Sequence, residues 1–145
     1  MIILDTHIWV WWVHGDHRLS PSAYAALDSH ASSGIVISAI SFWEVALLIT
    51  KQHLRVAYPL EEWIERAATY PGIRIQPLTH TVCVDACTLP GAFHNDPADR
   101  FLVATARELR CPLITEDARI LDYHYVNAIA PENVAVWTSP PDEEN

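Results

Sequence analysis

Four short stretches of this chain each place a carboxylate where a strand is expected to give way to a helix. The stretches are Ile2–Thr6, Ser41–Glu44, Asp96–Arg100 and Leu113–Asp117. In an open parallel sheet the carboxyl ends of the strands lie along one edge, where ligands bind, so acids far apart in sequence are expected to meet there. Several carboxylates in one pocket repel each other unless a hard cation such as Mg²⁺ or Mn²⁺ holds them. The pattern therefore indicates metal-assisted phosphoryl chemistry.

The hydrophobic pattern alternates between strand and helix along the chain. Short apolar runs predict strands at 1–4, 35–38, 73–76, 113–115 and 126–129. Amphipathic or capped segments predict helices at 6–14, 20–34, 41–53, 60–70, 79–89, 97–110 and 118–122. Ser20 and Pro21 mark the start of the second helix, and Gly34 marks its end. This alternation predicts an α/β fold in which helices flank a central parallel sheet of about five strands.

Length and composition favour one compact domain. The chain has 145 residues, of which 50% are hydrophobic and 19% charged, so it can bury a sizeable core. No apolar run approaches the length of a membrane span. The apolar segment 1–13 contains Asp5 and His7, and we interpret it as a core strand and helix rather than a signal peptide. We predict a domain over 1–138 and a flexible acidic tail over 139–145.

The net charge of -9 differs from the basic footprint of most nucleic-acid-binding proteins. Five of the 18 acids belong to the predicted site and three to the tail, so the other 10 nearly balance the nine Lys and Arg residues. We therefore expect no large basic groove and weak intrinsic affinity for nucleic acid.

Three cysteines are too few, and odd in number, for a disulfide framework, which fits a reducing cytoplasm. Cys83 and Cys87 are one helical turn apart and follow His80, so a zinc site on one helix face is one interpretation. The commoner interpretation of such cysteines is that their thiols are buried on an apolar helix face.

Each acid of the four stretches also has a structural interpretation. Ser41 and Glu44 match a capping box, and Asp96 followed by Pro97 matches a helix start. Asp5 and Asp117 can each cap the following helix, and such caps are worth about 1 kcal/mol. Against this, Asp5 ends an apolar strand and Glu44 lies in an apolar segment, where a charge is costly without a partner. Capping and metal binding can coexist, with Asp96 capping a helix while Asp99 faces a metal.

Arg100 follows the last of these acids in the 96–100 stretch. It could neutralise a neighbouring carboxylate or hold a phosphate through two hydrogen bonds. The alternative is a surface ion pair that contributes little.

The four stretches together resemble the PIN-domain family, and within it the VapC-type toxin ribonucleases of toxin–antitoxin pairs. The matching segments are Leu4–His7, Ser38–Ala46, His94–Ala104 and Leu113–Asp117. They cover nearly the whole chain, in the family's order and spacing. The departures are the three tryptophans of segment 6–14, where leucine is more typical, and the acidic net charge.

The resemblance implies a PIN-like three-layer sandwich and a Mg²⁺- or Mn²⁺-dependent endoribonuclease that leaves 5′-phosphate and 3′-hydroxyl ends. Asp5, Glu44, Asp99 and Asp117 correspond to the four catalytic and metal-binding acids, with Asp96 as a fifth nearby. Thr6, Thr115 and Arg100 are candidates for substrate binding. The implied partners are an RNA substrate, a cognate antitoxin protein and a second copy of the chain in a homodimer, in the cytoplasm and without a membrane.

Other functions remain open from the residues alone. A phosphatase with Asp5 as nucleophile would want a second acid where His7 stands. A P-loop or dinucleotide site is poorly supported because the chain has four glycines and no glycine-rich loop. The non-enzyme alternative is a PIN-like binding module whose acidic pocket receives a basic, antitoxin-like partner. His7 and His94 could touch RNA or the acids, or be bystanders.

The tryptophans carry a separate expectation. Core packing is predicted for Trp43. Trp9 and Trp12 are spaced i, i+3 and could form a partner or dimer surface.

Overall fold

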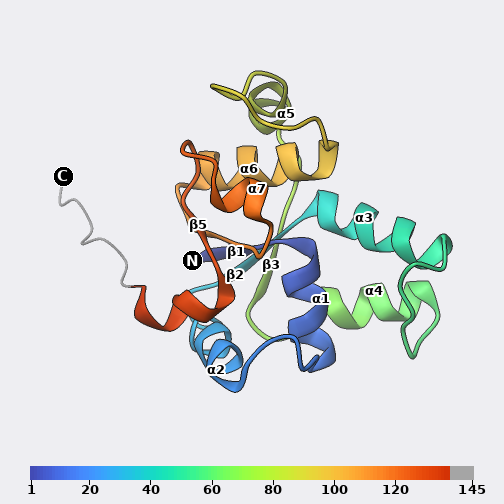
Figure 1. Ribbon diagram of the computed structural model, residues 1–145. Coiled ribbons are helices and arrows are strands. Elements are labelled where there is room, and N and C mark those ends of the chain that lie inside the picture. Colours follow the sequence, from blue (N-terminus) through green and yellow to red (C-terminus); the bar gives the residue numbers. More distant parts are fainter. Residues whose placement is uncertain (138–145) are drawn as a thin grey trace.

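The structure is a computed structural model that describes residues 1–137. Five strands alternate with helices and form one sheet (Figure 1). The strands are β1 (Ile2–Leu4), β2 (Ile35–Ser38), β3 (Ile73–Gln76), β4 (Leu113–Ile114) and β5 (Ala128–Ile129). The helices are α1 (Thr6–His14), α2 (Pro21–Ser29), α3 (Ala39–Thr50), α4 (Leu60–Ala68), α5 (His80–Cys87), α6 (Pro97–Leu109), α7 (Ala118–Leu121) and the 3₁₀ helix η1 (Pro131–Val136).

All strand pairs are parallel, and the strand order is β3-β2-β1-β4-β5. The first strand therefore lies at the centre of the sheet, and each of its three residues is fully buried. The chain runs from β1 through β2 to β3 on one side of the sheet and then crosses to β4 and β5 on the other side. This reversal of strand order beside β1 is the arrangement that opens a crevice at the strands' carboxyl ends. The predicted α/β class, with a five-stranded parallel sheet, is confirmed.

Helices cover both faces of the sheet and create two apolar cores. One core contains Trp9, Leu27 and Trp63 from α1, α2 and α4. The other contains Val82 and Leu102 from α5 and α6. Helix α3 contributes to both, with Ile40 in the second core and Val45 in the first. The result is the expected three-layer sandwich (Figure 1). Across residues 1–137, no helix combines the length and apolar character needed to cross a bilayer.

Two predicted helix boundaries are wrong, and each has a local cause. Helix α2 ends at Ser29, because His30 closes it with a backbone N–H to Leu27, and Gly34 instead enters β2 with φ +101°. Helix α3 begins at Ala39, because Ser38 is its N-cap and accepts from the Ile40 N–H at 3.2 Å. The alternative interpretation of Ser41 and Glu44 as a capping box is not supported, because Ser38 and not Ser41 caps the helix.

The expectation for the tryptophans is reversed. Trp9 and Trp12 are 0% and 2% exposed, whereas Trp43 is 54% exposed. Helix α1 follows the central strand directly, so its apolar face packs on the sheet instead of being presented to a partner. Trp9 contacts the rings of Phe42 and Trp63, with centroids 4.7 and 5.4 Å apart. The predicted acidic tail, 139–145, lies outside the described residues.

Candidate active site

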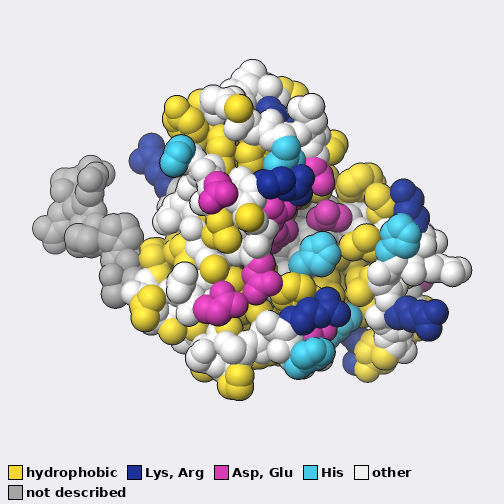
Figure 2. Space-filling model, viewed as in Figure 1, with side chains coloured by type: hydrophobic (Ala, Val, Ile, Leu, Met, Phe, Trp, Pro, Cys, Tyr) yellow, Lys and Arg dark blue, Asp and Glu magenta, His cyan; other side chains and the backbone are white. Residues whose placement is uncertain are grey.

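A cleft of about 330 Å³ gathers the predicted acids. It is lined by six carboxylate side chains, Asp5, Glu44, Asp96, Asp99, Glu116 and Asp117, and by His7, Trp11 and Arg119. Figure 2 shows magenta acidic side chains in a hollow of the molecular surface. All five acids that the sequence singled out are therefore brought together where β1 and β4 end and where α3 and α6 begin.

Asp5 is fixed by two hydrogen bonds. As the N-cap of α1 it accepts from the Thr6 N–H at 2.7 Å, and its other oxygen accepts from the Thr115 hydroxyl at 2.7 Å. That hydroxyl in turn accepts from the Asp117 N–H at 3.0 Å. The side chain is 9% exposed, and burial raises the pKa of the Asp5 carboxyl. Thr115 thus ties together the first and last acids of the site.

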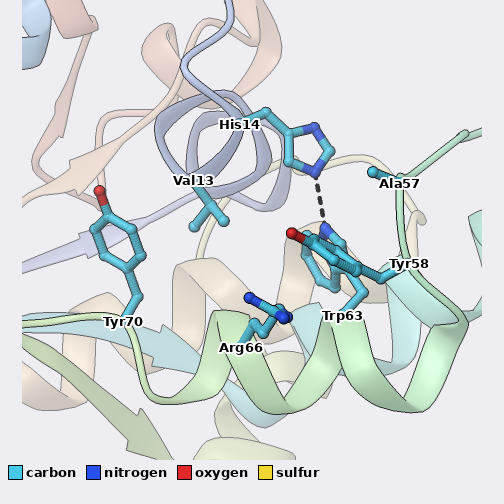
Figure 3. Close-up of a pocket in the computed structure, with 7 residues that line it drawn as sticks. All are labelled: Val13, His14, Ala57, Tyr58, Trp63, Arg66 and Tyr70. Atoms are coloured by element: carbon cyan, nitrogen blue, oxygen red, sulfur yellow. Dashed lines mark hydrogen bonds between the residues drawn. The ribbon is translucent and has the colours of Figure 1, made fainter.

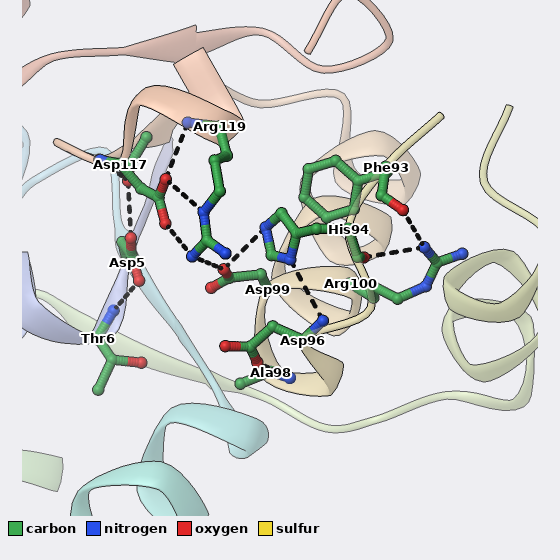
Figure 4. Close-up of polar contacts among 11 residues, drawn as sticks. Asp5, Thr6, Phe93, His94, Asp96, Ala98, Asp99, Arg100, Asp117 and Arg119 are labelled. Atoms are coloured by element: carbon green, nitrogen blue, oxygen red, sulfur yellow. Dashed lines mark hydrogen bonds and ion pairs between the residues drawn. The ribbon is translucent and has the colours of Figure 1, made fainter. Parts of the chain in front are cut away.

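Capping and clustering coexist at α6, as the sequence allowed. Asp96 caps the helix through the Ala98 N–H at 3.1 Å, and Asp99, in the first turn, is 7% exposed. Burial, and then the fields of the other carboxylates, beginning with Asp5, raises the pKa of Asp99 to about 7. The His94 ring stands beside it, with Nε2 3.1 Å from an Asp99 oxygen (Figure 4).

His94 is held by its other ring nitrogen. Its Nδ1 accepts from the Asp96 N–H at 3.2 Å, which leaves the proton of the neutral ring on Nε2, facing Asp99. Burial, followed by the Arg119 charge, lowers the pKa of His94. The histidine that the sequence left undecided therefore touches a site acid.

Glu44 reaches the cleft from α3. It is half-buried, burial raises the pKa of its carboxyl, and its Oε1 is enclosed without a hydrogen-bond partner among the described residues. The hydroxyls of Thr6 and Ser41 bond to each other at 2.9 Å. A buried carboxylate oxygen without a donor is a costly arrangement that a bound cation would relieve.

Arg119 is the one Lys or Arg side chain among the described residues that line the cleft, and the sequence analysis did not single it out. Its guanidinium lies 2.9 Å from an Asp117 oxygen and 3.5 Å from an Asp99 oxygen (Figure 4). The hydrogen bond to Arg119 lowers the pKa of Asp117. The sequence signal that could have identified Arg119 is its position two residues after Asp117, which caps a helix.

Arg100 lies elsewhere. Its guanidinium donates to the carbonyl oxygens of Ala86 at 2.7 Å and of Phe93 and His94 at 3.1 Å each. These bonds tie α6 to the end of α5 and to the loop that carries His94, and Arg100 is not among the residues that line the cleft. Its substrate-binding role stays a prediction, and the contacts favour a structural role.

The donor set suits a hard cation. His94, Asp99 and Asp117 each offer a ligand atom within 4.8 Å of the other two. The carboxylate oxygens of Asp99 and Asp117 match the preferences of Mg²⁺ and Mn²⁺. His94 would join them only as the other tautomer, without the hydrogen bond from the Asp96 N–H. Within residues 1–137 no other group of three metal-binding side chains forms, so the zinc interpretation of His80, Cys83 and Cys87 is not supported.

A second cavity, of about 240 Å³, lies between the end of α1 and α4 (Figure 3). Its walls include Val13, His14, Trp63 and Arg66, and none of the described residues that line it carries a carboxylate. The Trp63 indole donates to His14 Nε2 at 2.8 Å. The cavity therefore lacks the carboxylate ligands that a metal-assisted phosphoryl site needs.

We expect the raised pKa of Asp99 to make stability depend on pH. With a chelator present, the folded protein holds a proton on Asp99 that the unfolded chain releases above its ordinary value of 3.8. This contribution is therefore full near pH 4 and is lost as pH rises through about 7. Asp99→Asn removes this titrating group. The melting temperature of wild type should therefore fall relative to that of the variant as pH rises. Melting curves with chelator across this range measure it, and a constant difference would contradict the raised pKa.

Comparison with known proteins identifies a family and one similar protein. The PIN domain model matches residues 2–124. Ribonuclease VapC22 of Mycobacterium tuberculosis (strain ATCC 25618 / H37Rv) is 34% identical over 136 residues, which cover 94% of this chain and 98% of that protein.

Solved structures share the fold. VapBC2 from Rickettsia felis, bound to a promoter DNA fragment, has a TM-score of 0.66 at 16% identity, covering 90% of this chain and 98% of that chain. FitAcB from Neisseria gonorrhoeae has a TM-score of 0.63 at 23% identity, with the same coverage. The family model spans β1 to β4 and every residue that lines the cleft, and a relative matches nearly end to end, so the chain belongs to the PIN-domain family.

Proposed function

We propose that this protein is a VapC-type toxin, a metal-dependent endoribonuclease that hydrolyses RNA phosphodiester bonds at the acidic cleft. One observation carries the proposal: acids from four distant stretches converge in one cleft, in a chain 34% identical to a protein named as a ribonuclease. A bound Mg²⁺ or Mn²⁺ would supply an activated water and offset charge on the phosphate.

The position of each residue in the cleft indicates its role. Asp99 and Asp117, with His94, offer the closest set of ligand atoms, and Asp5 and Glu44 complete the negative wall. Thr115 holds one Asp5 oxygen in place, and the Thr6 N–H holds the other. His94 Nε2 lies 3.1 Å from an Asp99 oxygen. Arg119 is the cation nearest the acids and is suited to meet a phosphate oxygen.

A cognate antitoxin is the proposed protein partner. Similar folds were solved as toxin–antitoxin complexes, including one from Klebsiella pneumoniae with a TM-score of 0.62. A basic segment of such a partner would complement the six carboxylates of the cleft. The homodimer and the cytoplasmic location stay predictions.

Mn²⁺ titration by calorimetry tests the metal site. Wild type should bind Mn²⁺, and Asp99→Asn should lose more than about 100-fold in affinity, because even partners that only orient a ligand cost about 10–100-fold. Asp122→Asn is the matched control, since Asp122 is an exposed acid that does not line the cleft. Wild type should then cleave RNA with Mn²⁺ and stop with chelator.

The opposite result is equally informative. If wild type binds no Mn²⁺ at millimolar concentration, the acids act as helix caps and as a surface that receives a basic partner. The non-catalytic binding module would then replace the ribonuclease.

A further inference from the structure

A second polar pocket, of about 340 Å³, adjoins the acidic cleft and has the opposite charge. The two share His7 and Trp11 as wall residues, and Arg18, His53 and Arg55 line the far part of the second one. Figure 2 shows Lys, Arg and His side chains on the same face as the magenta cleft. We call this second space the basic pocket.

We propose that the basic pocket binds the RNA backbone next to the phosphate that is cut, and holds the chain through Arg18 and Arg55. The inference rests on the proposed ribonuclease function and adds the surface that positions the substrate.

The basic pocket keeps a positive charge even when the ion pair between Arg18 and Asp16 is taken into account. Asp16 is the one acidic side chain among the described residues that line it. The Asp16 carboxylate lies 3.5 Å from Arg18 Nε and accepts from the Arg18 N–H at 2.9 Å. No carboxylate of the described residues lies within ion-pair distance of Arg55. His14 adds no charge, because its Nε2 accepts the Trp63 N–H and burial lowers its pKa. The free charge of the pocket is therefore that of Arg55, with Arg18 able to exchange Asp16 for a phosphate.

A nuclease with this cleft needs such a surface. Six carboxylates repel the phosphates on either side of the bond to be cut, and a resident cation offsets this only locally. Exposed charges act over about 10 Å at 0.1 M salt, so only cations next to the cleft can hold the flanking chain. Because the two pockets share wall residues, the basic pocket lies close enough to the cleft to act on this flanking chain. The protein's net charge of -9 does not by itself attract RNA.

Trp11 gives the junction a flat surface. Its half-buried indole lines both pockets, the Arg18 guanidinium lies 5.3 Å from its ring centroid, and the His7 ring is 6.2 Å away. Bases stack on aromatic rings without regard to sequence, and arginine adds a cation–π contribution. A base on Trp11 would carry the backbone from the acidic cleft into the basic pocket, which favours single-stranded RNA as the occupant.

The test is RNA binding as a function of salt. A fluorescein-labelled single-stranded RNA is titrated with protein in chelator, and anisotropy is followed at several KCl concentrations. For Arg18→Ala/Arg55→Ala we expect roughly ten-fold weaker binding and a salt slope smaller by about 1.4, at about 0.7 per phosphate contact for a single strand. Arg18→Lys/Arg55→Lys keeps the charges and should keep most of the slope.

The control pair is Arg74→Ala/Arg110→Asn, which removes two arginines that line neither pocket. Asparagine suits position 110 because the residue there has φ +51°. Both test arginines are exposed, so melting temperatures should be nearly unchanged. Binding lost equally in the control pair would mean a general charge effect and would overturn the inference.

Cleavage kinetics separate this inference from the proposed function. If wild type cleaves RNA with Mn²⁺, the alanine pair should raise KM with kcat nearly unchanged. If wild type does not cleave, the ribonuclease proposal fails, while binding that depends on Arg18 and Arg55 would still support the pocket. Unchanged RNA affinity in the alanine pair, or no RNA binding by wild type, overturns the inference and leaves an acidic protein segment as the pocket's occupant.

Discussion

Asp5→Asn is expected to abolish RNA cleavage, by at least about a thousand-fold, while leaving the fold intact. The loss follows because the metal supplies several kcal/mol of stabilisation to the transition state, and each 1.4 kcal/mol is about ten-fold in rate. The fold should survive because asparagine keeps the oxygen that accepts from the Thr6 N–H. Its amide can also donate to the Thr115 hydroxyl, which now donates to Asp5.

The measurement is single-turnover cleavage of a labelled RNA with Mn²⁺, beside circular dichroism of the same preparations. Asp122→Asn serves again as the control acid and should cleave like wild type. Wild-type activity in folded Asp5→Asn would remove Asp5 from the catalytic set, and with it the proposed site.

Trp9→Ala should cost about 3–5 kcal/mol of folding free energy, a large share of the roughly 5–15 kcal/mol that a domain has. Trp9 is fully buried between the sheet, Phe42 and Trp63, so truncation leaves a cavity that its neighbours cannot fill. Trp9→Phe should cost much less, because phenylalanine fills most of the space and the Trp9 Nε1 has no hydrogen-bond partner among residues 1–137.

Urea denaturation in chelator measures both variants, with Trp43→Ala as the matched control. Trp43 is mostly exposed, so its removal should change stability by about 0.5 kcal/mol or less. Equal costs at positions 9 and 43 would contradict the packing described here.

The sequence predicted β1, β2 and β4 well because each is a short apolar run buried on both faces. The edge strands β3 and β5 are only partly buried, and β5 is shorter than predicted. The sequence also predicted that Asp5, Asp96 and Asp117 would each begin a helix, and all three do. The capping box at Ser41 failed because Ser38, three residues earlier, offers the same chemistry and sits where the strand ends. Pattern alone cannot rank two competing caps.

The convergence of the acids was predictable from topology, but their individual surroundings were not. The contacts of His94 with Asp99 and of Arg119 with Asp117 depend on how the loop before α6 and the helix α7 pack, which no periodicity encodes. Trp9 and Trp43 show the same limit, since both lie on helices with apolar neighbours and only tertiary packing separates buried from exposed.

The central position of β1 has a consequence for synthesis. Asp5 leaves the ribosome early, but its partners Thr115 and Asp117 lie after β4, which pairs with β1 only when most of the chain has been made. A growing or truncated chain that lacks this strand has neither the Asp5–Thr115 bond nor the last acid. The cleft is therefore complete only when nearly the whole chain has been synthesised.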